Sequence, residues 1–302
     1  MTPAGPKESA DVWTVRRVLA WASDDLKDKG SDTPRLDAEL LLAQVLGTNR
    51  IGLIVDPERP LSKTELSAYR DLHKRRRAAE PVAYMLGVRE FYGRPFRVDK
   101  RVLVPRPDTE ALVQVGIDRL VSRSLSARAL DLCTGSGCVA VTLACERPTW
   151  TVLGTDLSDD ALAVARDNAA RLGAAPRCWF RRSDLFADLG VDYPFDLITA
   201  NPPYIAVGET LPTTIVEHEP HLALFGGDDG LDVVRKIIEG APAHLAPGGV
   251  LALEIGAGQA PATAALLSAS GFEDVRVVKD YGGIERVVSG VRSKLEKLLV
   301  DY

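Results

Sequence analysis

The tetrapeptide Asn201-Pro202-Pro203-Tyr204 combines residue types that can hold a planar amide or amine nitrogen. Such a nitrogen is a poor nucleophile because its lone pair is delocalised. The side-chain oxygen of Asn201 and the backbone carbonyl of Pro202 can accept its two hydrogens and hold it in line with an electrophilic methyl group. The prolines stiffen this geometry, and Tyr204 offers a flat face to a planar group. We therefore take Asn201, Pro202 and Tyr204 as candidate catalytic residues, and all four as the candidate substrate site.

A second candidate site lies upstream, in the loop Cys133-Thr134-Gly135-Ser136-Gly137. This loop follows a predicted strand and directly precedes a helical pattern. Glycines at such a junction let a ligand approach backbone N–H groups closely. Asp156 closes the next predicted strand, where a β-α-β unit hydrogen-bonds a pair of ribose hydroxyls. The loop and Asp156 together predict a site for a nucleoside-containing cofactor.

The elements that position both sites are predicted from an alternation of short apolar runs with helical patterns. The apolar runs are residues 129–132, 150–155, 178–180, 195–200 and 250–254. This alternation is typical of a parallel sheet with crossover helices. Two later runs, 275–279 and 286–289, flank Tyr281-Gly282-Gly283 as an antiparallel hairpin would, and residues 291–302 have the pattern of a polar helix. We therefore expect an α/β fold.

The N-terminal segment, from residue 11 to about 85, shows helical patterns only and predicts a small helical bundle. Asp32-Thr33-Pro34 offers a cap and a first-turn proline, and Ser62 followed by Glu65 predicts a capping box. We interpret Trp13 and Trp21 as core aromatics, together with apolar residues at helical spacing, which are Val12, Val15, Val18, Leu19 and Ala22. A β-hairpin is predicted next, in residues 88–104 around Tyr92-Gly93-Arg94-Pro95.

Composition excludes several classes of protein. The chain has 302 residues, 46% of them hydrophobic, and a formal net charge of −5. Enough apolar residues are present to exclude disorder, and Gly and Pro show no collagen-like period. The one basic run, Lys74-Arg75-Arg76-Arg77, is interpreted as solvated charge on an exposed helix face, so nucleic acid is not an expected partner.

Cysteine and histidine spacing predicts neither a disulfide framework nor a metal site. The four cysteines lack CxxC spacing and are expected to be reduced core thiols; they are Cys133, Cys138, Cys145 and Cys178. The segment Glu217-His218-Glu219-Pro220-His221 lacks a histidine pair at i and i+4, and Pro220 would interrupt a helix. The N-terminus has no signal-peptide pattern, and no apolar run approaches the ~20 residues of a membrane span. We therefore expect a cytoplasmic protein that binds no metal and no membrane.

Several segments, taken in order, resemble the PrmC/HemK family, the N(5)-glutamine methyltransferases that modify peptide chain release factors. The resemblance covers nearly the whole chain. It rests on Glu80-Pro81 with Gly87-Val88-Arg89-Glu90-Phe91, on Pro105-Arg106-Pro107-Asp108-Thr109-Glu110, on the two candidate sites, on Glu219-Pro220 with Leu222 and Gly226-Gly227, and on Asp280-Tyr281 before Glu285-Arg286.

The resemblance implies a class I, Rossmann-like methyltransferase that depends on S-adenosyl-L-methionine and has a seven-stranded, mostly parallel sheet. The implied domains are an N-terminal helical bundle (1–86), a β-hairpin linker (87–105) and the methyltransferase domain (106–302). The first two help to dock a release factor. The implied reaction methylates the side-chain amide nitrogen of the glutamine in the Gly-Gly-Gln motif of the release factor. A monomer is expected, with no direct contact to nucleic acid.

Residue roles follow from the same resemblance. Residues 133–137, which are Cys133, Thr134, Gly135, Ser136 and Gly137, would line the methionine side of the cofactor. Asp156 would hold the ribose hydroxyls, Leu185 would lie near the adenine, and Asn201 would border both cofactor and substrate. Arg106 and Glu110 would lie near the same cleft. The sequence departs from the family pattern at Cys133, where a glycine is usual, and at Leu185, where an aromatic residue is common.

Two other functions fit parts of the pattern. An N(6)-adenine nucleic-acid methyltransferase could use the same tetrapeptide on an exocyclic amine, but it would have to flip a base and grip phosphates. The negative net charge, the near-neutral helical segment and the lack of a sizeable insertion after Tyr204 disfavour it. A non-catalytic binding module is disfavoured by the intact tetrapeptide.

Overall fold

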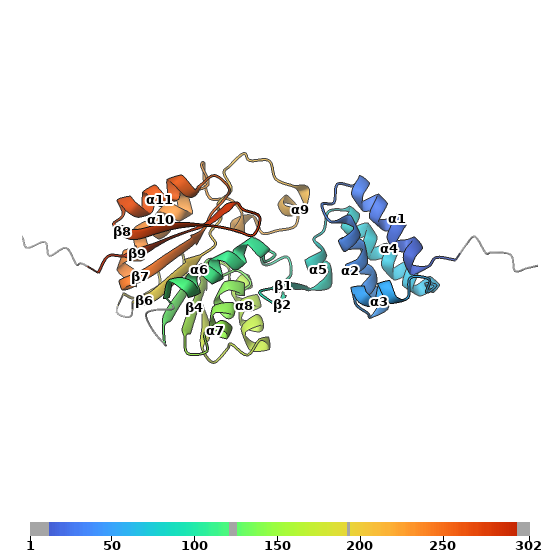
Figure 1. Ribbon diagram of the computed structural model, residues 1–302, viewed down its shortest axis with the longest axis horizontal. Helices are drawn as coiled ribbons and strands as arrows, with labels where there is room; N and C mark the ends of the chain where they lie inside the picture. The colour runs from blue at the N-terminus through green and yellow to red at the C-terminus, as the bar shows by residue number, and fades with distance from the viewer. Residues whose placement is uncertain (1–11, 121–125, 192–193, 295–302) are drawn as a thin grey trace, which may run out of the picture. The chain divides into compact units, whose positions relative to one another are not determined.

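The computed structural model describes residues 12–120, 126–191 and 194–294, which group into two compact units. One unit ends at Leu86 and the other begins at Gly87 (Figure 1). Each unit has a hydrophobic core of its own, so the two are described separately. No helix in the described ranges is long and apolar enough to cross a membrane.

The smaller unit consists of short helices around one core. They are α1 (Val15–Asp28), α2 (Pro34–Leu46), α3 (Arg50–Val55), α4 (Lys63–Arg77) and α5 (Val82–Leu86). Pro34 begins α2 as predicted, but the predicted cap is wrong, since Thr33 makes no side-chain capping hydrogen bond; the left-handed Gly47 ends the helix. The predicted capping box is confirmed, since the Glu65 amide donates to Ser62 Oγ at 3.2 Å and the Ser62 amide donates to Glu65 Oε2 at 2.8 Å. Local signals, namely a proline, a glycine and a capping box, therefore set these helix ends.

Two residues predicted for this core lie outside it. Val12 and Trp21 are 45% and 43% exposed, whereas Trp13 packs against the core. Trp21 precedes the buried Ala22, and one residue turns roughly 100° around a helix. Trp21 therefore lies at the edge of the apolar stripe, where its ring packs on His73 with centroids 4.6 Å apart.

The basic run on α4 is not simply solvated charge. Arg76 Nε lies 2.8 Å from Asp37 Oδ2, and these side chains are only 11% and 7% exposed. Arg75 pairs with Glu80 and Arg77 with Asp25 at the surface. The prediction was wrong for Arg76. Its partner Asp37 lies on α2, so the sequence around Arg76 gives no indication of the ion pair.

The predicted β-hairpin is confirmed and groups with the larger unit. Strands β1 (Val88–Phe91) and β2 (Arg94–Arg97) are antiparallel. The turn residues Tyr92 and Gly93 have φ of 51° and 69°, as a tight two-residue hairpin turn requires. Phe91 and Phe96 are buried in the core of the larger unit.

The larger unit is built on a seven-stranded sheet. In sheet order the strands are β5 (Cys178–Arg182), β4 (Thr151–Asp156), β3 (Arg128–Leu132), β6 (Phe195–Ala200), β7 (Leu245–Glu254), β9 (Glu285–Arg292) and β8 (Phe272–Lys279). The first five are parallel, and β9 is antiparallel to both β7 and β8. The predicted mostly parallel α/β sheet is therefore confirmed.

Helices cover both faces of this sheet (Figure 1). Successive strand residues point to opposite faces, and Ala129 and Leu130 accordingly belong to different cores. One core holds α6 (Glu110–Leu120), α7 (Cys138–Glu146) and part of α8 (Asp159–Arg171). The other holds α10 (Asp232–His244) and α11 (Ala260–Ala269). Three one-turn helices lie in connecting loops: η1 (Pro107–Thr109), α9 (Thr213–Val216) and η2 (His221–Ala223).

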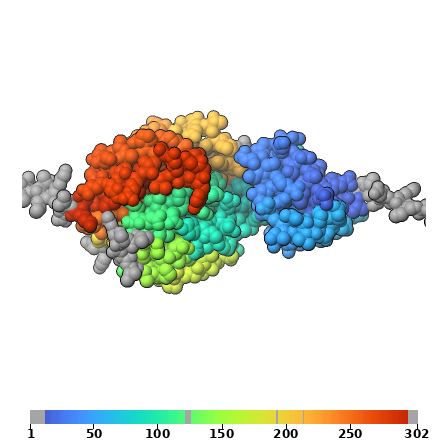
Figure 2. Space-filling model, viewed as in Figure 1, coloured from blue at the N-terminus to red at the C-terminus, as the bar shows by residue number. Residues whose placement is uncertain are grey.

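The last two strands of the sheet, β8 and β9, border α6 on the surface of this unit. In Figure 2 the red C-terminal strands border the green segment that contains α6. Arg119 Nη1 lies 3.0 Å from Asp274 Oδ2 across this border. The predicted helix from residue 291 is wrong at Val291 and Arg292, because β9 continues there and Val291 pairs with Val250 in the sheet. Residues 295–302 of that prediction lie outside the described residues.

Candidate active site

A cavity of about 490 Å³ opens where β3, β4 and β6 end. Parallel strands place their carboxyl ends at one edge of the sheet, so the loops that follow them meet there. Seven of the eight predicted cofactor residues line this cavity: Cys133, Thr134, Gly135, Ser136, Asp156, Leu185 and Asn201. The two candidate sites found in the sequence therefore share one cavity.

The eighth predicted residue, Gly137, faces away from the cavity. It caps the N-terminus of α7 with φ of 77°, and an added Cβ would lie 3.0 Å from the Cβ of Ala165. Gly137 therefore allows α7 to pack closely on α8. By contrast, an added Cβ on Gly135 would meet no protein atom within 4 Å.

Short-range hydrogen bonds hold the glycine loop. The Thr134 amide donates to the Thr155 carbonyl at 2.9 Å, and the Gly135 amide donates to Asp156 Oδ2 at 2.9 Å. Asp156 Oδ1 also accepts from the Ser158 amide at 2.9 Å, and burial raises the pKa of Asp156. Cys133 has φ of 55°, a left-handed conformation that costs a non-glycine residue about 1–2 kcal/mol.

Asp131 is a buried carboxyl group beneath this loop. It accepts hydrogen bonds from Thr134 Oγ1 at 2.6 Å and from Thr199 Oγ1 at 2.8 Å. Burial nevertheless raises the pKa of Asp131 to about 6. Asp131 lines the cavity and was not predicted as a site residue, although it lies one residue before the end of β3.

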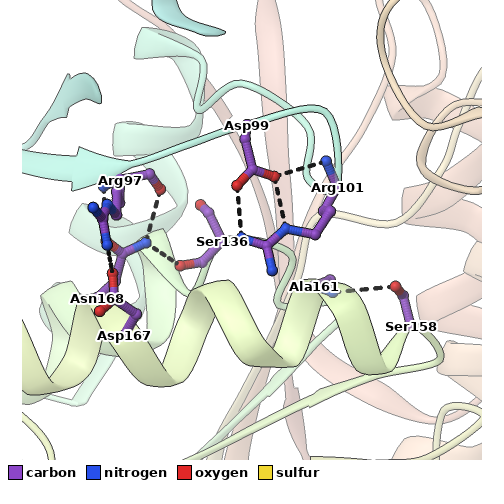
Figure 3. Close-up of polar contacts among 8 residues, drawn as sticks. All are labelled: Arg97, Asp99, Arg101, Ser136, Ser158, Ala161, Asp167 and Asn168. Atoms are coloured by element: carbon purple, nitrogen blue, oxygen red, sulfur yellow. Dashed lines mark hydrogen bonds and ion pairs between the residues drawn. The ribbon is translucent and has the colours of Figure 1, made fainter. Parts of the chain in front are cut away.

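Asn168 on α8 ties the glycine loop to the β-hairpin (Figure 3). Its Oδ1 accepts from the Arg97 amide at 2.7 Å, and its Nδ2 donates to the Arg97 carbonyl at 3.0 Å and the Ser136 carbonyl at 2.9 Å. The segment after β2 continues into the cavity wall, which includes Lys100 to Leu103. The fully buried Asn168 thus holds two walls of the cavity together, and the sequence did not point to it.

The tetrapeptide after β6 presents two of its four residues to the cavity. Asn201 and Pro203 line it, whereas Pro202 is buried and neither Pro202 nor Tyr204 is a lining residue. Burial raises the pKa of Tyr204 to about 12. The tyrosine is therefore a neutral, largely enclosed ring in this structure.

Close backbone contacts hold the tetrapeptide from behind. An added Cβ on Gly226 would lie 2.4 Å from the Pro203 carbonyl oxygen, and one on Gly230 would lie 2.2 Å from the Tyr204 carbonyl oxygen. Gln259 Nε2 donates to that same Tyr204 oxygen at 2.9 Å. The backbone of the tetrapeptide therefore leaves little room for movement.

Arg106 lines the cavity as expected and makes an ion pair that links two loops. Its Nη2 lies 2.6 Å from Oε1 of Glu219, and Oε2 of Glu219 accepts from the Val104 amide at 3.2 Å. Glu110 does not line the cavity. It directly follows the lining residue Thr109, and its carboxylate accepts a hydrogen bond from the Tyr92 amide of the hairpin turn at 2.8 Å.

Other lining residues were missed from the sequence. Ser183 and Asp184 directly follow β5, so their place at a strand end was a usable signal. Thr109 lies in the segment 105–110, which carries part of the family resemblance but does not itself indicate a role for Thr109. Lys236 comes from α10 and carries no local signal. Among the described residues, no group of three or more His, Cys, Asp or Glu could hold a metal ion.

The cavity suits a nucleoside cofactor with an attached amino acid. Its volume falls within the ~300–1,000 Å³ that is typical of small-molecule sites. Open space over Gly135 gives access to backbone, the carboxylates of Asp156 and Asp184 can accept hydroxyl or amine hydrogens, and Leu157 and Leu185 supply apolar walls. Asn201 lies in the same cavity, so a nitrogen held there is adjacent to whatever the glycine loop binds.

Two family models match the sequence. Residues 17–87 match the PrmC N-terminal domain, and residues 109–222 match the methyltransferase small domain. A release factor glutamine methyltransferase of Geobacter sulfurreducens is 44% identical over 285 residues, which are 94% of this chain and 98% of that protein. One of Cereibacter sphaeroides is 45% identical over 274 residues, 90% of this chain and 96% of that protein.

A solved structure matches the fold of the larger part of the chain. The 16S rRNA N2 G1207 methyltransferase of T. thermophilus, in complex with AdoMet and guanosine, superposes with a TM-score of 0.51 at 21% identity. The match covers 68% of this chain and 49% of that one. At this identity the likeness concerns the fold alone.

Proposed function

The chain belongs to the family of release factor glutamine methyltransferases, and we infer from this premise that it methylates the glutamine of release factors. The methyl group comes from S-adenosyl-L-methionine and goes to the side-chain amide nitrogen of the glutamine in the Gly-Gly-Gln motif. One observation supports this reaction most directly: Asn201 lines the same cavity as the glycine loop and Asp156. The N(6)-adenine alternative gains no support from the relatives, whose names specify glutamine.

The residues of the cavity fit the cofactor, and we propose their roles accordingly. The glycine loop, Cys133 to Gly135 with Ser136, borders the methionine side, Asp156 accepts from the ribose hydroxyls, and Leu185 packs near the adenine. When bound, S-adenosyl-L-methionine supplies a methyl group on a positively charged sulfur, so the acceptor nitrogen needs no strong general base. The protein's task is therefore to position that nitrogen.

Asn201 and Pro202 are proposed to hold the glutamine amide. The amide nitrogen has two hydrogens, and the Asn201 Oδ1 and the Pro202 carbonyl can accept one each. This holds the nitrogen with its lone pair toward the methyl group, and such positioning contributes on the order of 7–11 kcal/mol in favourable cases. Pro203 lines the cavity beside Asn201, and Tyr204, which is not a lining residue in this structure, is proposed to offer the flat face of its ring to the glutamine amide. The contacts of Gly226 and Gln259 with this loop support a rigid receptor.

The N-terminal unit is proposed to dock the release factor. The match of residues 17–87 to the PrmC N-terminal domain supports this role, since the relatives are named for the same protein substrate. We further propose that the enzyme is a cytoplasmic monomer, that the helical bundle spans residues 1–86, and that the hairpin over 87–105 links it to the methyltransferase domain.

Methyl transfer from labelled S-adenosyl-L-methionine to a purified release factor tests the function. The matched controls are the same factor with its loop glutamine changed to alanine, and a duplex DNA. We expect label on the unaltered factor alone. Label on DNA, or equal label on the alanine factor, contradicts the proposal.

Asn201→Ala tests the assigned residue in the same assay. Removal of an oxygen that holds the reacting group lowers kcat by at least about 100-fold, as removal of a transition-state hydrogen bond does elsewhere. Cofactor binding, measured by calorimetry, shows whether the variant still folds its cavity. Turnover at the wild-type rate would refute the role of Asn201.

A further inference from the structure

Asn201 can hold the glutamine amide only if it presents its oxygen to the cavity. The two ends of an asparagine amide are nearly equal in size, so packing alone discriminates poorly between Oδ1 and Nδ2. Flipped by 180°, Asn201 would point two N–H hydrogens at a nitrogen that also carries hydrogens. Resting on the proposed function, we propose that Thr109 and Glu254 are positioning residues that set the orientation of the Asn201 amide.

The first contact joins Asn201 to Thr109. Asn201 Nδ2 donates to Thr109 Oγ1 at 3.2 Å, and Thr109 is 2% exposed. Because the nitrogen end is engaged by this buried hydroxyl, Oδ1 is left for another partner. Thr109 and Asn201 both line the cavity, so this partner can be a bound group.

The second contact, made by Glu254, determines which group donates in the hydrogen bond between Asn201 and Thr109. Glu254, which is 1% exposed, lies at the end of β7 beside Thr109 and Asn201, and both of these side chains lower the pKa of its carboxyl group as hydrogen-bond donors. Above its raised pKa of about 7, the Glu254 carboxylate is ionised and only accepts, so the single hydrogen of the Thr109 hydroxyl points to Glu254. The Thr109 oxygen can then only accept from Asn201, and it is Nδ2 that must face it.

The other oxygen of Glu254 has no hydrogen-bond partner in the described part of the chain. Glu254 Oε2 is buried and unpaired among the described residues. A buried carboxyl group in this state lowers stability, and a well-packed apolar residue would not. Its presence beneath the substrate site is therefore better explained by function than by stability.

Arg286 on β9 brings the two positioning residues together. Its Nη2 lies 3.5 Å from Asp108, the neighbour of Thr109, and its Nη1 donates to the carbonyl of Ile255, the neighbour of Glu254, at 3.2 Å. Nε of Arg286 lies 3.0 Å from Asp280, which fixes the guanidinium. Two family segments without an assigned role, Pro105–Glu110 and Asp280–Arg286, thus converge behind Asn201.

Two substitutions at one position test the proposal. Thr109→Val keeps the shape of the side chain but removes the hydroxyl, whereas Thr109→Ser keeps the hydroxyl. We expect Thr109→Val to lower kcat about tenfold, the effect of losing roughly one hydrogen bond, with the cofactor Kd within twofold of wild type. Thr109→Ser should restore kcat to within about threefold of wild type.

A second measurement reports on the amide itself. The ¹⁵N side-chain resonance of Asn201, assigned by its disappearance in Asn201→Ala, should shift in Thr109→Val and remain near its wild-type position in Thr109→Ser. Equal kcat in Thr109→Val and wild type, or equal loss in the Ser and Val variants, would overturn the proposal. Failure of the proposed function is distinct from this, since the wild-type enzyme would then not label the release factor at all.

Discussion

Two loops at one edge of the sheet, residues 133–137 after β3 and residues 201–204 after β6, are held in different ways. The first is bonded mainly within one β-α-β unit, through Thr155 and Asp156, with Asn168 as its most distant partner. The second is bonded to Thr109, which precedes Asn201 by 92 residues, and to Gln259, which follows Tyr204 by 55 residues.

The two loops also differ in the space around them: the glycine loop is open, whereas the tetrapeptide is closely packed. An added Cβ on Gly135 meets nothing within 4 Å, whereas one on Gly226 meets the Pro203 carbonyl oxygen at 2.4 Å. Binding a cofactor needs accessible backbone N–H groups, which one β-α-β unit can supply. Holding a reacting nitrogen needs one fixed orientation, and here the support comes from several distant segments. The two loops should therefore respond to substitution in different kinetic parameters.

The largest expected effect is that of Gly226→Ala. The new Cβ would displace the Pro203 carbonyl, and a shift of about 1 Å in a positioning loop costs on the order of 100-fold in rate. We expect kcat on the release factor to fall about 100-fold. Gly190→Ala is the matched control, because an added Cβ there meets nothing within 4 Å and its φ is not left-handed. Comparable kcat values in Gly226→Ala and Gly190→Ala would show that the tetrapeptide does not depend on close packing against Gly226.

A smaller effect concerns the pH dependence of stability. Burial raises the pKa of Glu254 from 4.5 to about 7, so the folded state keeps this proton at pH values where the unfolded state has lost it. The free energy of unfolding should therefore fall as pH rises from 4.5 through 7, by about 3 kcal/mol in total.

Glu254→Gln, which does not titrate, isolates this contribution. The difference in unfolding free energy between wild type and Glu254→Gln, measured in urea at intervals from pH 4.5 to 8, should shift by that amount in favour of the variant. A difference that is constant with pH would show that Glu254 does not titrate in this range. Asp131, which lies beneath the glycine loop, has its pKa raised to about 6. It should therefore also lower the free energy of unfolding as pH rises, over a lower pH range than Glu254 does.

The smallest expected effect is that of Cys133→Gly. Glycine adopts the left-handed φ of 55° without strain and removes a side chain from the cavity wall. We expect the cofactor Kd to fall by up to about fivefold in calorimetry, with a smaller change in kcat. A kcat reduced more than tenfold at saturating cofactor would mean that the glycine loop also positions the reacting groups.

Local patterns in the sequence were enough to predict much of this protein. The strands, the hairpin turn at Tyr92-Gly93 and the capping box of Ser62 and Glu65 were predicted correctly, because period and turn chemistry act over a few residues. The tetrapeptide and the glycine loop are contiguous, so their chemistry could be predicted from the residues. Their meeting in one cavity followed from the parallel sheet.

Only the tertiary structure decided how the site is supported. Thr109, Asn168 and Glu254 are single polar residues whose partners lie 32 to 145 residues away in the chain, and no periodic signal marks them. The same reason explains the error at Arg76, whose charge is paired with Asp37 on another helix. The four adjacent residues 201–204 were enough to predict a site that holds an amide or amine nitrogen. The orientation of the Asn201 side chain, by contrast, depends on contacts that exist only after folding.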